Sequence, residues 1–211
     1  MLYQRGDLGV VCLLLAAGAS PAAVANNHFD PLLYAARHGH AGVAKALIEA
    51  GAGLHTDLTG KNALVWAAEK GHVAVVDVLI AAHFCDVNAR LGDHTVLTLT
   101  AMAGRVAPVT ALVRAGADVD AVVGDRRGAT ALLLAAELGH VSIVEALLDD
   151  GASVEARDAA GWTALIAGAR SGSRAVVQTL VDAGADVQAR AQDGHSGATH
   201  VIAFGFECEC S

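Results

Sequence analysis

The sequence has few aromatic residues and few cysteines, and both shortages narrow what the chain can be. Aromatic residues make up 4% of the 211 residues, whereas the broad apolar class reaches 54%, so a core must consist mainly of alanine, leucine and valine. The four cysteines form no CxxC pair and no disulfide framework, which favours a reducing compartment. A formal net charge of −8 argues against general nucleic-acid binding through phosphate contacts.

Motifs for catalysis and phosphate binding are also missing from the sequence. No motif selects a Ser/His/Asp or Cys/His set. Gly42, Gly51 and Gly53 are not followed by the Lys-Ser/Thr pair of a phosphate-binding loop. The sequence therefore predicts a protein that is not an enzyme and that has no cofactor.

Histidine is abundant, with ten residues, so a metal site has to be weighed. His38 and His40 have the spacing of a ligand pair, but we expect Gly39 between them to end a helix and turn the two rings apart. Cys208 and Cys210 are close to a single histidine near the end of the sequence, which is weak evidence for a metal centre. The sequence thus predicts no metal site.

A helix-ending glycine recurs along the chain at nearly constant spacing. The steps between successive copies are 33, 32, 33, 35 and 33 residues, at Gly6, Gly39, Gly71, Gly104, Gly139 and Gly172. In the copy at 128–152, Thr130 is a favoured N-cap, Gly139 ends the first helix and Gly151 ends the second. The second helix carries an apolar stripe that two short helices cannot bury alone, so each copy needs a neighbour like itself.

These features together resemble the ankyrin repeat family from Leu2 to about Glu207. The shared features are the period of about 33 residues, the Gly-His pair between helices and the Gly-Ala pair after them. Favoured N-cap residues begin the first helices of five fuller repeats, at Asp30, Asn62, Thr95, Thr130 and Thr163. The resemblance implies an all-α solenoid, in which antiparallel helix pairs stack and β-turn fingers connect them.

The resemblance also implies a single array over residues 1–211. Its expected units are a partial repeat 1–25, full repeats at about 26–56, 57–89, 90–123, 124–157 and 158–190, and a partial repeat 191–211. The family's Thr-Pro-Leu-His tetrapeptide is nowhere intact. His83 stands where other repeats have glycine, which predicts a weak point. Val122 and Val123 lengthen one finger and are expected to expose apolar surface there.

The segment Leu8–Ala19 permits two interpretations. It imitates the apolar core of a signal peptide, but its apolar register repeats that of the later second helices, which favours a helix of a first repeat. We expect the side chain of Cys12, which lies in that helix, to be packed like that of a small apolar residue. Neither end of the sequence shows the polar outer face of a capping repeat, so the chain is expected to be a segment of a longer array or to have unusual caps.

In the family, the fingers and the ends of the first helices line a concave groove that binds partners. Carried over to this sequence, the positions expected to bind a partner are Arg37, His38, Lys61, Lys70, His94, Met102, Arg126, Arg127, Trp162 and Arg170. Bases outnumber acids among the finger and helix-end residues, although the whole chain is acidic. Trp162 and Arg127 are the expected anchors, because Trp and Arg are enriched in binding hot spots.

The remaining aromatic and histidine residues receive structural roles. His40, His72 and His140 occupy the Gly-His slot, where the ring usually satisfies loop backbone. His55, His94 and His195 belong to finger regions and are expected to make surface contacts. Trp66 is expected to pack partly against the following repeat.

The resulting interpretation is a non-catalytic, cytoplasmic interaction scaffold. Its partner is expected to be a protein or peptide of acidic or mixed charge, with no nucleic acid and no membrane involved, and the chain is expected to be a monomer or a segment of a longer array. The alternative is an ankyrin segment that targets a larger enzyme or a secreted effector. A metal site or hydrolase within the array is a third class, which metal analysis would test.

Overall fold

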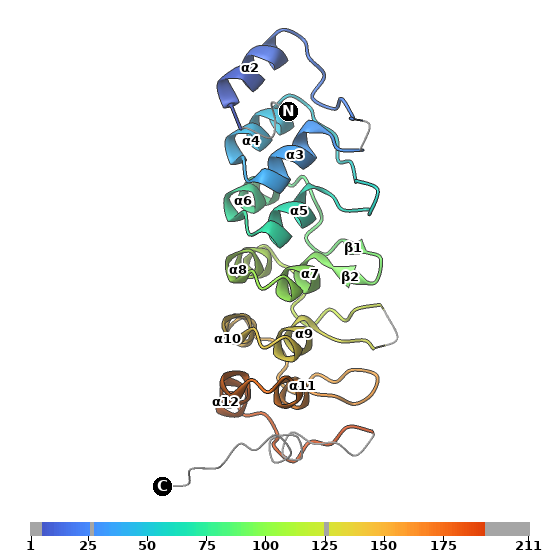
Figure 1. Ribbon diagram of the computed structural model, residues 1–211, viewed down its shortest axis with the longest axis vertical. Coiled ribbons are helices and arrows are strands. Elements are labelled where there is room, and N and C mark those ends of the chain that lie inside the picture. Colours follow the sequence, from blue (N-terminus) through green and yellow to red (C-terminus); the bar gives the residue numbers. More distant parts are fainter. Residues whose placement is uncertain (1–5, 26–27, 125–126, 193–211) are drawn as a thin grey trace.

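The computed structural model describes residues 6–25, 28–124 and 127–192. Helix pairs stack along one axis, with loops projecting to one side (Figure 1). The first helices are α3 (Pro31–His38), α5 (Ala63–Lys70), α7 (Val96–Met102), α9 (Ala131–Glu137) and α11 (Ala164–Ser171). The second helices are α2 (Leu8–Ala16), α4 (Ala41–Glu49), α6 (Val73–Ala81), α8 (Val106–Arg114), α10 (Val141–Asp149) and α12 (Arg174–Asp182). The expected all-α solenoid is therefore confirmed.

One finger contains the short strands β1 (Arg90–Leu91) and β2 (His94–Thr95), which pair antiparallel. The other loops project from the stack on the same side as this hairpin, next to the first helices (Figure 1). The first helices thus lie between the loops and the second helices.

Each first helix begins at the N-cap residue that the sequence indicates. The side chain of the cap accepts a hydrogen bond from the backbone N–H three residues later at Asp30, Asn62, Thr95, Thr130 and Thr163. These bonds satisfy N–H groups that have no partner within the helix. Gly39, Gly71 and Gly172 end their helices in the left-handed conformation.

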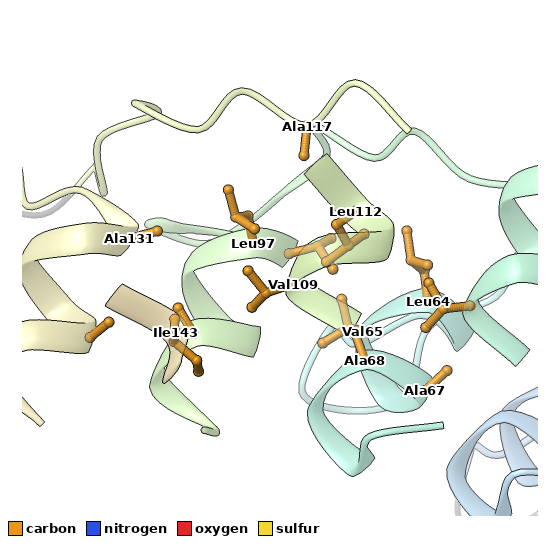
Figure 2. Close-up of a cluster of buried hydrophobic side chains, with 14 of the residues drawn as sticks. Leu64, Val65, Ala67, Ala68, Leu97, Val109, Leu112, Ala117, Ala131 and Ile143 are labelled. Carbon is orange, nitrogen blue, oxygen red and sulfur yellow. The ribbon is translucent and has the colours of Figure 1, made fainter. Parts of the chain in front are cut away.

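The core is a continuous layer between neighbouring repeats. Leu64 and Val65 of α5, Leu97 of α7 and Ala131 of α9 belong to successive repeats and to one buried cluster (Figure 2). First helices contact first helices of the next repeat, and second helices contact second helices. Fully buried alanine pairs in the first helices, such as 67–68 and 135–136, allow this close stacking.

In the repeats of α6, α8 and α10, the residue after the helix-ending glycine binds the preceding repeat. His72 Nε2 lies 3.1 Å from the carbonyl oxygen of Arg37, and the matching contact of His140 Nε2 to Met102 is 3.3 Å. At the intervening repeat, Arg105 Nε donates to the carbonyl oxygen of Glu69 at 3.2 Å. The predicted backbone contacts of His72 and His140 are confirmed, and an arginine performs the same task.

The N-terminal helix α2 packs on α4, in the register that the sequence predicts. Val11 is fully buried, whereas Leu13 is 72% exposed and Cys12 is also exposed. The expectation that Cys12 packs inside is wrong, because only one narrow stripe of α2 meets the next repeat. Within the described ranges, no helix combines the length and apolar character needed to cross a membrane.

Two segments depart from the regular repeat, one at His83 and one in the finger that contains Val122 and Val123. His83 has a φ of 49°, so this residue does adopt the left-handed conformation in which other repeats place glycine. Val122 is 48% exposed, so this finger does expose apolar surface as expected, whereas Val123 beside it is buried. The Val123 N–H donates to the Ala129 carbonyl, and this bond turns the finger back toward the core.

We predict that His83→Gly stabilises the protein by about 0.5–1 kcal/mol. Replacing His83 by glycine removes a left-handed backbone strain of about 1–2 kcal/mol. Part of this gain is offset, because glycine also raises the conformational entropy of the unfolded chain. The converse control is Gly116→His, at the equivalent position of the next repeat, where φ is 92° and an added Cβ meets nothing within 4 Å. In urea unfolding, the free energy of unfolding should rise in His83→Gly and fall in Gly116→His. A lower free energy of unfolding in His83→Gly would contradict the prediction.

Candidate functional site

Cationic side chains from two repeats surround the indole of Trp66. The guanidinium carbon of Arg37 lies 4.8 Å from the ring centroid, and the Nζ atoms of Lys61 and Lys70 lie 5.1 and 5.7 Å away. The Phe29 ring is 5.7 Å from the Trp66 ring and also lies under Arg37. We call these five residues the Trp66 cluster.

The cations of the Trp66 cluster differ in whether they have an acidic partner. Lys61 Nζ binds both carboxylate oxygens of Glu69, at 2.6 and 2.8 Å. Arg37 and Lys70 are exposed, and neither makes an ion pair with another residue of the described chain. Two cations beside one aromatic surface are therefore available to an anionic ligand.

Asp57 in the adjoining finger fixes the edge of the indole. Its Oδ2 atom accepts from Trp66 Nε1 at 2.9 Å. Its Oδ1 atom accepts from the backbone N–H groups of Thr59 and Lys61 and from the Thr59 hydroxyl. Burial raises the pKa of this carboxyl, but the hydrogen bonds outweigh burial and the net pKa is lowered. Asp57 therefore holds the finger and the ring together as a carboxylate.

A second aromatic and cationic group lies three repeats further along the stack. The Arg170 guanidinium is 5.1 Å from the ring centroid of Trp162. Trp162 is only partly exposed, because its finger folds over Asp158, whose Oδ1 accepts the Trp162 backbone N–H. Arg127 pairs with Glu137 at 3.0 Å.

These contacts change the expectations for charge and for anchors. Lys61 and Arg127 are both neutralised by glutamates of their own repeats, so neither is a free base for a partner, although the surplus of bases over acids is unchanged. Trp66 contacts Arg37 of the preceding repeat, whereas the sequence suggests packing against the following one. Composition and spacing do not reveal the Trp66 cluster, because its members come from different repeats.

Two other predicted site residues belong to the repeat that follows that of Trp66. Met102 is 39% exposed at the end of α7, and His94 lies in β2. The buried Nδ1 atom of His94 has no hydrogen-bond partner among the described residues. Arg126 lies outside the described residues, as do His195, Cys208, Cys210 and nearly all of the partial repeat 191–211.

One histidine expectation is wrong, and a second histidine has a partner that the sequence does not show. The rings of His38 and His40 are not turned apart: they lie nearly parallel, with their centroids 6.2 Å apart. Gly39 between them adopts the left-handed conformation and turns the chain. Burial, followed by the nearby charges of Arg37, His40 and His72, lowers the pKa of His38. The side chain of His55 is 41% exposed, and its Nδ1 lies 2.8 Å from Oδ2 of buried Asp30.

The described ranges offer little for catalysis or metal binding. They contain no group of three or more His, Cys, Asp and Glu side chains that could hold a metal ion. Burial raises the pKa of the Cys85 thiol to about 11, which leaves little thiolate at neutral pH. The arrangement supports recognition of another molecule more than it supports chemistry.

Comparison with known proteins gives one consistent result. A family model described as ankyrin repeats (3 copies) matches residues 1–91 and 97–191. The chain is 33% identical over 157 residues to the ankyrin repeat and KH domain-containing protein mask-1 of Caenorhabditis elegans, covering 74% of this chain and 6% of that protein. A Caenorhabditis briggsae protein of the same description, CBG24701, is 35% identical over 130 residues, covering 61% of this chain and 5% of that protein.

Solved structures show the same likeness. The ankyrin repeat domain of Bcl-3, described as a unique member of the IkappaB protein family, has a TM-score of 0.81 at 27% identity, covering 94% of this chain and 90% of that one. The human ASB11 ankyrin repeat domain has a TM-score of 0.82 at 28% identity, covering 92% and 87%.

We predict that Asp57→Asn destabilises the protein by about 1–3 kcal/mol at pH 7, because Trp66 and the finger lose a charged acceptor. The lowered pKa means that the ionised carboxylate stabilises the fold above its ordinary pKa of 3.8. That contribution is lost as the pH falls through the folded-state pKa. The difference in unfolding free energy between wild type and variant should therefore shrink below pH 4.

Urea titrations at several pH values measure this difference. The matched control is Asp86→Asn, which alters an exposed carboxylate with a single described hydrogen bond, to the Asn88 N–H. If the Asp57→Asn variant loses the same free energy of unfolding at every pH, the charge of Asp57 does not contribute to stability.

Proposed function

The chain belongs to the ankyrin repeat family, and from this premise we propose that it is a non-catalytic scaffold that binds an acidic or mixed-charge peptide segment. Ankyrin repeats are a general protein–protein interaction module. Fold alone does not select a partner, so the proposal depends on the surface of the first helices and fingers. We further propose a cytoplasmic location, because the exposed thiol of Cys12 is unpaired.

The Trp66 cluster is the observation that carries this proposal. Arg37 and Lys70 can bind a carboxylate from either side, while the partly exposed Trp66 indole, packed against buried Phe29, offers an apolar surface for a neighbouring side chain. Charge-assisted hydrogen bonds to Arg are strong, and partly buried aromatic residues next to Arg are typical of binding hot spots. An acidic residue beside an apolar one is thus the sequence feature that we expect in the partner.

The second group, Trp162 with Arg170, suggests the length of the bound segment. It is three steps of the stack away from α5, and adjacent packed helices are about 8–10 Å apart. The two groups are therefore roughly 24–30 Å apart, which an extended peptide of about eight or nine residues can span. We expect a segment with acidic residues near both ends and apolar residues between them.

Selection of displayed random peptides on the intact chain tests this proposal. We predict enrichment of sequences that combine Asp or Glu with an apolar neighbour. For a selected peptide, Arg37→Ala with Lys70→Ala should weaken binding by about 1–3 kcal/mol, measured by fluorescence anisotropy.

The matched control is Lys45→Ala with Arg114→Ala, which removes two exposed cations from the second helices. This control should leave the affinity unchanged. An absence of acidic peptides among those selected, or equal losses in both double variants, would contradict an acidic partner on the first-helix face.

A further inference from the structure

The second helices carry an apolar surface on the side turned away from the first helices. Two neighbouring hollows lie there, one of about 630 Å³ between α6 and α8 and one of about 430 Å³ between α4 and α6. Val73, Ile80 and Ala111 are among the residues of the larger hollow. Ile48 and Val78 are among those of the smaller one.

Asp77 lies between the two hollows and lines both of them. Its side chain is exposed, and it makes no ion pair or side-chain hydrogen bond with another described residue. By contrast, the two charged residues of α4 at the far rim, Lys45 and Glu49, face each other at 3.9 Å. Arg114 also lines the larger hollow but not the smaller one, whereas Asp77 lines both. The position between the hollows therefore favours a cation of the ligand, with an apolar group on either side of it.

We propose that this surface, the Asp77 saddle, binds an amphipathic helix of a partner protein. The hollows lie on either side of α6, so their separation follows the spacing of adjacent helices, about 8–10 Å. Seven residues of an α-helix rise about 10.5 Å. Residues i and i+7 of the bound helix therefore fill successive hollows, and a Lys or Arg at i+4 on the same face meets Asp77.

This proposal is independent of the acidic peptide on the first-helix face. The inward sides of α6 and α8 are occupied by buried residues such as Val76, Leu79 and Leu112, so the saddle is on the opposite side of those helices. The partner chemistry also differs, since the saddle selects a basic and apolar helix.

The test uses the intact chain and a designed probe. The probe is a fluorescein-labelled helical peptide with Leu at i and i+7 and Lys at i+4, and its matched control has Glu at i+4. The Lys peptide should bind more tightly by about two- to fivefold, the range of an exposed ion pair. Asp77→Asn should remove that preference, and Asp77→Lys should reverse it.

Two further variants separate the saddle from general effects. Ala111→Arg places a long charged side chain in the larger hollow and should abolish binding of both peptides. Glu145→Gln changes the acid at the equivalent position of α10 and should have no effect. The proposal is overturned if the Lys peptide does not bind saturably, if Asp77→Asn leaves its preference intact, or if Glu145→Gln weakens it as much. Circular dichroism confirms that each variant is folded.

Discussion

Packing between neighbouring repeats is the constraint on which the rest of this structure depends. The apolar residues of each helix pair are covered only by the neighbouring pairs, as Leu64, Leu97 and Leu132 show in three successive repeats. Small residues make the fit possible, because alanines in the first helices bring the backbones close together. A protein with 4% aromatic residues can therefore bury an extended core that runs along the stack of repeats and has no single centre.

The same constraint places the functional groups. Arg37 and Trp66 are 29 positions apart in sequence, yet their repeats stack directly and bring the guanidinium over the ring. The contacts of His72, Arg105 and His140 to the preceding repeat hold this alignment. A binding surface then needs no pocket within one repeat, since it forms wherever side chains of successive repeats meet.

The fold follows from the sequence because its signals are local. Caps such as Asp30 and Thr163, the periodic glycines and the apolar register each act within a few residues, and all agree. The candidate site is less predictable, because pairing depends on rotamers and on neighbouring repeats. The sequence does not show that Glu69 neutralises Lys61, that His55 binds Asp30, or that Val123 turns inward. Predictions from single positions therefore identified charged residues but not which of them are available.

Native-state hydrogen exchange tests most directly whether contacts between neighbouring repeats stabilise the chain. Helices covered on both sides should open least, so amides of α7 and α9 should exchange slowest. Helix α2, in which only Val11 is buried, should exchange fastest. Protection in α2 equal to that in α7 would contradict the account, because it would show that stability does not depend on cover by adjacent repeats.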